Sequence, residues 1–299
     1  MAYDVSKLSA YVAENKDLLV KEVLFGGAEG DTIANLTKQL GIKTSENIHS
    51  LNLNPTLQNG KGCGFNAQGD TEITERVIET AAIKVNEEWC PDDLLAKYAE
   101  YLVRLGADAN AETLPFEAEI VDALVAGINK KMETLVWAGN KDNGDLINGF
   151  LKIANDESDK VDVNISGMSA LEAAKAIVKA LPEDIIDDAV IFMSPAKYRD
   201  LVLDLVDKNY YKYDAGNTSD EDVVIPGTSV RVHKTLGLAG KSEMFASAYA
   251  NMFYGADAMN DKEEVRIWFS DDDDKFKLKV KFNAGVQVAF PDLVVYAHE

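Results

Sequence analysis

Cysteine, histidine and long apolar runs are scarce in this sequence of 299 residues, which contains two cysteines and three histidines. Two cysteines do not make a disulfide framework, so the sequence favours a reducing cytoplasm as its compartment. No stretch approaches the roughly 20 consecutive apolar residues of a membrane-spanning helix. The first residues include Asp4 and Ser6 and lack the basic end and apolar stretch of a secretory signal. A hydrophobic share of 46% is that of an ordinary globular protein.

Basic residues are also in deficit. The chain has 30 lysines and arginines against 51 acidic residues, a formal net charge of −21. Binding to a phosphate backbone depends on clustered lysine and arginine, so this composition disfavours a nucleic-acid-binding function. Copies of the chain repel one another unless buried area or counterions offset the repulsion.

Metal-binding and nucleophilic motifs are missing as well. His49, His233 and His298 are far apart, and no His-Glu-x-x-His or Cys-x-x-Cys pair is present, so no zinc site is predicted. Cys63 and Cys90 could meet if two arms of a hairpin pair, although isolated thiols more often serve as inert packing. There is no Gly-x-Ser-x-Gly elbow. We therefore predict no catalytic, cofactor-binding or metal-binding residues, and no enzyme activity.

Two glycine-rich segments resemble nucleotide-binding motifs only superficially. Residues 237–242 read Gly-Leu-Ala-Gly-Lys-Ser, with two residues between the glycines where a phosphate-binding loop needs four, so a surface turn is favoured. Gly60, Gly62 and Gly64 are followed by Phe65, where a dinucleotide-binding fingerprint requires its third glycine. A hairpin tip is the preferred interpretation of this segment.

Residues 271–274 are all aspartate and could bind a divalent cation. They lack the spacing and the glycine of an EF-hand, so a solvated loop is favoured. From 275 to 282, lysines alternate with Phe276, Leu278, Val280 and Phe282, which predicts a strand with one apolar and one basic face. For the basic face, contacts with acidic partner surfaces or with solvent are favoured over nucleic acid.

A long amphipathic helix is predicted over 115–138. Ile120, Leu124, Ile128 and Leu135 recur at helical spacing. Thr113 suits the N-cap and Pro115 the first turn. Gly139 is expected to end the helix in the left-handed conformation.

The remaining elements are predicted from capping residues, from glycine and proline, and from the spacing of apolar residues. Before the long helix we expect a helix over 4–25 and a short helix from Asp31 to Gly41 that carries Ile33, Leu36 and Leu40. A strand from Ile48, an extended stretch over 71–89 and a helix from Pro91 to Gly106 are expected next. After it we expect a helix with the capping box Ser169/Glu172, a buried strand over 189–193, a helix capped by Ser194-Pro195, and strands over 223–225, 230–232, 244–246 and 265–269.

Several phrases in this order resemble one family. Residues 116–151 resemble the long spine helix, and the loop after it, of the Hong Kong 97-type major capsid proteins of tailed phages. Further phrases resemble that family's axial and peripheral strands. They are Val-Ile-Phe-Met-Ser-Pro at 190–195, Ile-Pro-Gly-Thr-Ser-Val at 225–230, Phe-Tyr-Gly-Ala-Asp at 253–257, Phe-Asn-Ala-Gly-Val-Gln at 282–287 and Phe-Pro at 290–291.

The resemblance covers nearly the whole chain and implies an α+β fold of the Hong Kong 97 type. It implies an N-terminal arm over 1–47 and an extended loop hairpin over 48–90. A peripheral domain is expected over 91–165 and 256–299, including the spine helix at 115–138, and an axial α/β domain over 166–255.

The implied function is that of a major capsid protein, which self-assembles into the hexamers and pentamers of an icosahedral tailed-phage head around double-stranded DNA. Its partners would be copies of itself, with scaffold and portal proteins and possible decoration proteins, and with neither sequence-specific nucleic-acid binding nor a membrane. Assembly would occur in the host bacterial cytoplasm, and the protein would reside in the virion capsid.

Two rival functions remain open. One is an encapsulin-like nanocompartment shell that stores a cargo enzyme. The other, from a different class, is a soluble enzyme or binding protein with a phosphate site near Gly240.

Overall fold

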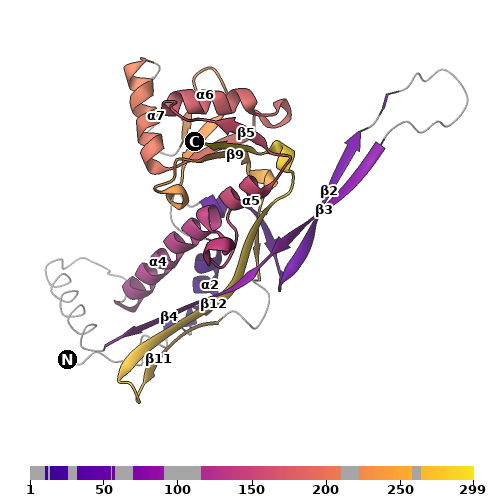
Figure 1. The fold of residues 1–299 in the computed structure, drawn as a ribbon. Coiled ribbons are helices and arrows are strands. Elements are labelled where there is room, and N and C mark those ends of the chain that lie inside the picture. Colours follow the sequence, from indigo (N-terminus) through magenta and orange to yellow (C-terminus); the bar gives the residue numbers. More distant parts are fainter. Residues whose placement is uncertain are drawn as a thin grey trace, which may run out of the picture.

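The computed structural model describes residues 11–12, 14–25, 32–54, 56–57, 70–90, 116–209, 222–257 and 264–299. They form a lower lobe built on a long helix, an upper lobe built on a mixed sheet, and a hairpin that projects away from both (Figure 1). The predicted helix from Pro91 to Gly106, the glycine-rich segment with Cys63, and the proposed caps Thr113 and Pro115 lie outside the described residues.

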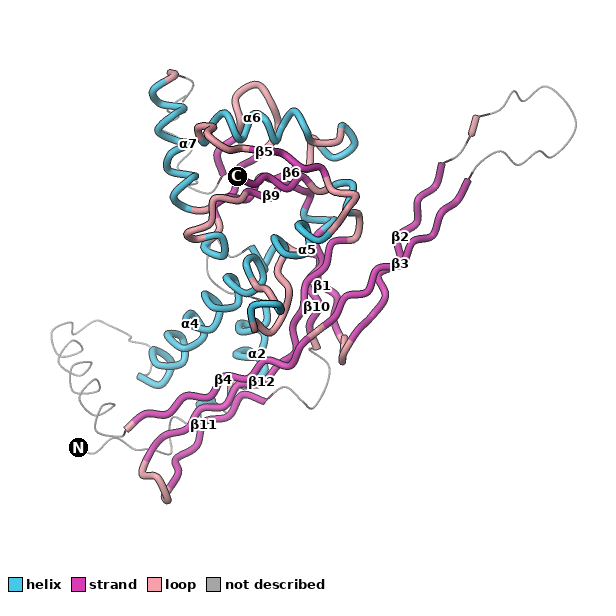
Figure 2. The backbone as a smooth tube through the Cα atoms, viewed as in Figure 1, coloured by secondary structure: helices cyan, strands magenta, loops and turns pink. Residues whose placement is uncertain are grey.

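The lower lobe contains a sheet of five strands, here the lower sheet. Its strands are β1 (Thr37–Leu40), β4 (Ala81–Trp89), β10 (Met252–Ala256), β11 (Glu264–Ser270) and β12 (Lys275–Val288). β12 is the central strand. β4 pairs with one edge of it, and β11 and β10 pair with successive parts of its other edge. It runs the length of the lobe (Figure 2). β1 adds to β10 in parallel.

Helices α2 (Lys16–Phe25) and α4 (Phe116–Ala138) cover one face of this sheet. β12 alternates half-buried and buried residues from Lys275 onward, as its sequence predicts. The buried set, Phe276, Leu278, Val280 and Phe282, belongs to one apolar cluster with Val121, Val125, Ile128 and Met132 of α4. Burying the apolar faces of helix and sheet against each other is the main stabilising term of this lobe.

The upper lobe contains a sheet of six strands, here the upper sheet, in the order β5-β13-β9-β6-β8-β7. Its elements are β5 (Val161–Asn164), α6 (Ala170–Ala180), β6 (Ala189–Met193), α7 (Pro195–Asp207), β7 (Asp222–Val224), β8 (Arg231–Lys234), β9 (Met244–Ala248) and β13 (Val295–His298). One face of the sheet packs on α6 and α7. The other contributes Phe192, Phe245 and Tyr296 to the core of the lower lobe.

Short elements complete the described chain. They are α5 (Phe150–Asp156) and the 3-10 helices η1 (Thr32–Asn35), η2 (Lys141–Asn143), η3 (Glu183–Ile185), η4 (Leu236–Leu238), η5 (Tyr249–Asn251) and η6 (Pro291–Leu293). Several sequence expectations are confirmed here. Ser169 and Glu172 form the predicted capping box of α6, β6 is buried throughout, and Ser194 caps α7 with Pro195 in its first turn.

The prediction of a short helix between Asp31 and Gly41 is wrong. The chain forms only η1 and then strand β1, which pairs with β10 from Thr37↔Phe253 to Leu40↔Ala256. The ladder satisfies the backbone of these residues, which a helix of so few turns does only in part. Leu40 is accordingly exposed, not buried on a helix face.

The expectation for Gly139 is also wrong. Gly139 is not among the glycines with positive φ, whereas Gly144, five residues later, has φ of 94°. Gly139 is required for a different reason. A Cβ there would lie 2.4 Å from the carbonyl oxygen of Leu135 and 2.7 Å from that of Ile147, distances that a side-chain carbon does not tolerate.

Strand partners also differ from the expected domain ranges. The paired hairpin runs from β2 (Ser45–Asn54) to β3 (Asp70–Glu79), while β4, expected in the same hairpin, lies in the lower sheet. The upper sheet draws β5 and β13 from ranges assigned to the peripheral domain. β10, expected at the end of the axial domain, pairs with β12 in the lower sheet instead.

Candidate functional site

Within the described part of the chain, one hairpin projects from the two lobes. β2 and β3 form a sheet of two strands, paired from Ser45↔Glu79 to Asn54↔Asp70. The hairpin extends away from both lobes (Figure 1). Beyond the end of β2, the side chain of Leu57 is 97% exposed, and Val77 near the base is 45% exposed. A hairpin of two strands is marginally stable alone in water, so an element of this shape is expected to lie on a partner.

The base of the hairpin, by contrast, is fixed to the rest of the molecule. The guanidinium of Arg76 on β3 donates two hydrogen bonds to the carboxylate of Glu157, just after α5, and the Nη1–Oε2 distance is 3.3 Å. Lys141 Nζ lies 2.9 Å from Oε2 of Glu79. Ile48 and Ile78 are buried in a small apolar cluster with Ile42 and Ala289.

A close backbone contact adds to this anchorage. A Cβ on Gly285 of β12 would lie 2.0 Å from the carbonyl oxygen of Glu79, so only glycine allows the hairpin to leave the sheet at this point. Gln287 Nε2 also donates to the carbonyl oxygen of Val77 over 2.9 Å. The lower lobe therefore sets the direction in which the hairpin leaves the molecule.

The junction between the two lobes is built around Trp137, near the C-terminus of α4. Its ring centroid lies 5.3 Å from that of Phe150, 4.7 Å from that of Phe192 and 5.7 Å from that of Phe245. The first of these rings comes from α5 and the other two from the upper sheet. The backbone of Gly237 packs directly against the indole ring. A Cβ at Gly237 would lie 2.3 Å from Cδ1 of Trp137, so a larger residue does not fit there.

A buried carboxylate joins three separate segments at the same junction. Oε1 of Glu133 on α4 accepts hydrogen bonds from the backbone N–H and the hydroxyl of Thr32, from the hydroxyl of Thr235 at 2.7 Å, and from Nε1 of Trp137 at 3.1 Å. Thr32 lies in η1 and Thr235 caps η4 in the upper lobe. Glu133 is 2% exposed, so these donors replace the water that Oε1 would otherwise bind.

Tyr254 on β10 is fully buried, and its hydroxyl has no hydrogen-bond partner among the described residues. Burial raises the pKa of this phenol well above its ordinary value, and the charge of Glu133 adds to the effect. Burial therefore favours the protonated, neutral form of this hydroxyl.

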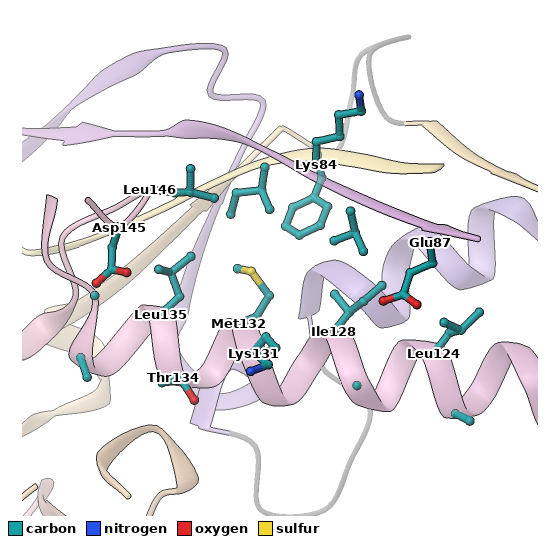
Figure 3. Close-up of a pocket in the computed structure, with 17 residues that line it drawn as sticks. Lys84, Glu87, Leu124, Ile128, Lys131, Met132, Thr134, Leu135, Asp145 and Leu146 are labelled. Atoms are coloured by element: carbon teal, nitrogen blue, oxygen red, sulfur yellow. The ribbon is translucent and has the colours of Figure 1, made fainter. Parts of the chain in front are cut away.

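A groove lies between the middle of α4 and strand β4, and it is here named the α4–β4 groove (Figure 3). Its volume is about 700 Å³. Apolar side chains form its walls, and Lys84, Lys131, Glu87 and Asp145 stand at its rim. The apolar wall residues are Ile83, Val85, Ala123, Leu124, Ile128, Met132, Leu135, Ala138, Leu146 and Phe282. Leu146, in the loop after α4, is 49% exposed.

Gly127 lies in the helical wall of this groove. Apart from the backbone of its own helix, a Cβ there would meet no atom of the described residues within 4 Å, and its φ is not positive. Neither close packing nor backbone conformation requires glycine, which costs a helix interior roughly 1 kcal/mol relative to alanine. The chain is therefore less stable than it could be at a point where the glycine leaves space open.

The residues considered for metal, redox or nucleotide chemistry do not gather. His49 pairs with Glu75 on the hairpin, His233 is buried in β8, and His298 lies at the end of β13. Within the described residues, no group of three or more histidine, cysteine or acidic side chains is placed to hold a metal ion. Cys90 is exposed as a free thiol, and a pairing with Cys63 falls outside the described part of the chain.

The basic face of β12 is partly neutralised within the molecule. Lys275 Nζ lies 2.5 Å from Oε1 of Glu88, and Lys277 pairs with Asp273 in the turn after β11. The hydrogen bond from Lys277 lowers the pKa of the Asp273 carboxyl, and the bond to Glu88 raises the pKa of the Lys275 ammonium. This aspartate in the run 271–274 thus has a lysine as its partner.

Comparison with solved structures finds the same fold in virus shells. One chain of the "Satellite phage P4 procapsid including size determination (Sid) protein" is 11% identical, with a TM-score of 0.63 over 98% of this chain and 96% of that one. A chain of the "Capsid of empty GTA particle computed with C5 symmetry" is 11% identical, with a TM-score of 0.60 over 97% and 98%.

The chain has the fold of phage capsid proteins. The capsid fold also matches a chain from the "Crystal structure of virus-like particle from Pyrococcus furiosus", 10% identical, with a TM-score of 0.51 over 98% of this chain and 99% of that one. No protein-family model and no curated protein sequence matches this chain. The expected α+β class and the resemblance to the Hong Kong 97-type capsid proteins are confirmed.

Within this capsid fold, sequence reasoning found the hairpin and α4 but missed the lobe junction and the groove. Glu133 and Trp137 are four residues apart and so share one helix face, and a glutamate on an otherwise apolar face was a signal that could have marked a buried acceptor. Gly127, in the middle of a predicted helix, was the available signal for the groove. No helix in the described part of the chain is long and apolar enough to span a membrane.

Proposed function

We propose that this protein is a major capsid protein, which self-assembles into the hexamers and pentamers of an icosahedral tailed-phage head enclosing double-stranded DNA. The observation that carries the proposal is a capsid fold matched over nearly the full length of the chain. The hairpin of β2 and β3 supports it, since this element is anchored at its base, extends away from both lobes and is followed by the exposed Leu57.

The mechanism is mechanical. The lower lobe, with α4 lying on its sheet, forms the rigid peripheral part, and the upper lobe meets its copies around the axis of each capsomer. The hairpin clasps an adjacent subunit. Each contact alone is small, but a subunit that touches several neighbours sums them into a large buried area. This area offsets the repulsion between copies that each have a net charge of −21.

Because screening weakens that repulsion, assembly is expected to improve as the salt concentration rises from very low values. A shell whose assembly is best at the lowest ionic strength would contradict this mechanism.

Negative-stain microscopy and sedimentation of the purified full-length protein test the proposal. We expect closed shells. The matched control is a shortened variant in which residues 51–73 are replaced by Asn-Gly, so that the Ser50↔Thr74 pair and the anchored base are kept. This variant should unfold at the same temperature as the parent subunit and form no shells. A parent protein that stays monomeric or dimeric and binds nucleotides tightly would overturn the proposal in favour of a soluble enzyme or binding protein.

Further parts of the proposal concern partners and place. Scaffold and portal proteins, and possible decoration proteins, are proposed partners. The protein is proposed to have no enzyme activity, to assemble in the host bacterial cytoplasm and to reside in the virion capsid. Structural likeness to phage capsid proteins supports the capsid location and the structural role.

A second candidate function is an encapsulin-like compartment, which the match to the Pyrococcus furiosus virus-like particle favours. The contents of purified particles discriminate between the two. Protected double-stranded DNA of uniform length supports a phage head, whereas a co-purifying cargo enzyme supports a compartment.

A further inference from the structure

We propose that Thr32, Glu133 and Thr235 form a conformational lock, in which the N-terminal segment and the upper-lobe turn at η4 are held on helix α4 together or released together. The N-terminal segment is here residues 32–40, which include η1 and β1. Its attachment thereby controls how firmly the upper lobe is held. The inference concerns a single subunit, so it can fail while the proposed capsid function stands, and the reverse.

Both segments depend on one oxygen atom. Oε1 of Glu133 accepts hydrogen bonds from the hydroxyl of Thr32 and from that of Thr235, the latter over 2.7 Å. It also accepts from the backbone N–H of Thr32 over 3.3 Å and from Nε1 of Trp137 over 3.1 Å. One oxygen of an ionised carboxylate offers roughly two lone-pair sites, so these donors compete for a shared acceptor. A change at one donor therefore alters the bonds of the others.

Each threonine hydroxyl also accepts a hydrogen bond from its own surroundings. Thr32 Oγ1 accepts from Nε1 of Trp137 over 2.7 Å, and Thr235 Oγ1 accepts from the backbone N–H of Gly237 over 3.1 Å. The backbone N–H of Thr235 donates to the carbonyl oxygen of Met193, the last residue of β6, over 3.1 Å. Hydrogen bonds in such a chain polarise and strengthen one another. The chain of bonds runs from the N-terminal segment through α4 to the upper sheet.

Burial makes a half-released arrangement unfavourable. Thr32 and Thr235 are fully buried, and Glu133 is 2% exposed. If Thr32 left alone, the carboxylate would lose donors and would gain water only if the site opened further. A buried charge without enough donors costs much more than one that is fully bonded or hydrated. The two favourable states are therefore a closed one, with both threonines bound, and an open one, with water around the carboxylate.

The apolar contacts of the two segments are joined in the same way. Ile33 and Leu36 of the N-terminal segment and Leu238 of η4 lie in the same buried cluster as Trp137. Displacing either segment exposes apolar surface of this shared cluster, which adds to the cost of separating them. The polar and apolar contacts thus favour the same cooperative behaviour.

Amide hydrogen exchange of the full-length protein tests the lock, because the opening of a segment raises the exchange rate of its backbone amides. The amides to follow are those of residues 237–239 and 241, which are hydrogen-bonded within the turn at η4. Those of α6 are the reference for global stability, since α6 packs in a separate apolar cluster. Samples are compared in the same state of assembly, which sedimentation verifies.

Thr32→Val is the decisive variant, because it replaces the hydroxyl on the N-terminal segment by a methyl group. Thr32→Ser keeps the hydroxyl and is the conservative control. The matched control is Thr37→Val on the same segment. The hydroxyl of Thr37 donates to the carbonyl oxygen of Tyr249 over 3.3 Å, so its loss removes a hydrogen bond of this segment that does not involve Glu133.

We expect the η4 amides to exchange at least tenfold faster in Thr32→Val than in the parent, with α6 unchanged. In Thr32→Ser and Thr37→Val the η4 rates should stay within about twofold of the parent. Because coupling is reciprocal, Thr235→Val should accelerate exchange of the β1 amides, which lie in the ladder with β10, by a similar factor.

Faster exchange confined to the N-terminal segment in Thr32→Val would show that the two bonds are independent and would overturn the lock. Equal acceleration in α6 would show general destabilisation and would overturn it as well. If Thr32→Val did not fold, the reciprocal measurement on Thr235→Val would decide by the same criteria.

Discussion

Two faces of helix α4 are packed in opposite ways. Around Trp137, three aromatic rings and Gly237 pack closely, and Oε1 of Glu133 beside them accepts several hydrogen bonds. Around Gly127, the side that faces β4 opens into the α4–β4 groove. Two glycines illustrate this difference. A Cβ on Gly237 would overlap the ring of Trp137, whereas a Cβ on Gly127 would meet no described atom within 4 Å outside the backbone of its own helix.

The difference teaches that one helix can present a closed face and an open face. The face with Trp137 joins the two lobes of the subunit through aromatic contacts. The face with Gly127 leaves space open beside β4. Substitutions at the two places should therefore change stability by different amounts and in opposite directions.

The largest expected change in stability is at the junction between the two lobes. Trp137→Ala removes a fully buried ring that joins both lobes, and we expect the free energy of unfolding of the subunit to fall by about 3–5 kcal/mol. Denaturant titration of dissociated subunits measures the change. A loss below about 1 kcal/mol would mean that the junction collapses around the gap, and the comparison between the two regions would then fail.

Glu133→Ala should have the next largest effect. It leaves the donors of Thr32 and Thr235 without their common acceptor, while Trp137 Nε1 still donates to the hydroxyl of Thr32 over 2.7 Å. Buried donors left unpaired cost about 1–3 kcal/mol. Glu133→Gln is the control, because its amide oxygen can still accept and its volume is nearly unchanged. The same titration should rank the two variants, with glutamine the milder. Equal losses in both would indicate that the charge, not the acceptor, matters.

Gly237→Ala is expected to destabilise the subunit by about 1–3 kcal/mol, because overpacking displaces either the ring of Trp137 or the η4 backbone. The fluorescence of the tryptophans and the melting temperature of the subunit report both consequences. An alanine accepted without a change in melting temperature would show that the junction is looser than its contacts suggest.

Gly127→Ala is the matched substitution in the groove and should have the smallest effect, with the opposite sign. We expect it to stabilise the dissociated subunit by roughly 0.8–1 kcal/mol, since alanine is the better helix former and has open space around it. The melting temperature should rise slightly. A decrease would mean that the groove is closed in solution and would remove the basis of the comparison.

Local sequence signals predicted most of the elements because those elements depend on short-range rules. The spacing of Ile120, Leu124 and Ile128 predicted α4 to within a residue of its observed bounds. The alternation of lysines with apolar residues predicted the first half of β12. The capping box at Ser169 predicted the start of α6. Each of these signals is complete within a few residues of chain.

Long-range pairing was where sequence reasoning failed. The stretch from Thr37 to Leu40 contains nothing that identifies β10 as its partner, so a helix was predicted there in place of a strand. Likewise, β4 continues the extended stretch of β3, and only its pairing with β12 separates it from the hairpin. Gly139 was interpreted as a left-handed terminus because the approach of the Ile147 carbonyl is not visible in the sequence.

The sequence by itself determined helices α2, α4, α6 and α7, many of the strands and the acidic charge of each copy, because propensity, periodicity and composition act locally or add up along the chain. The tertiary structure decided that Glu133 joins three segments, that the hairpin leaves the molecule with Leu57 uncovered, and that an open groove lies over Gly127. These features arise from contacts between residues many tens of positions apart, and such contacts are set by how lobes and sheets pack, which no local pattern records.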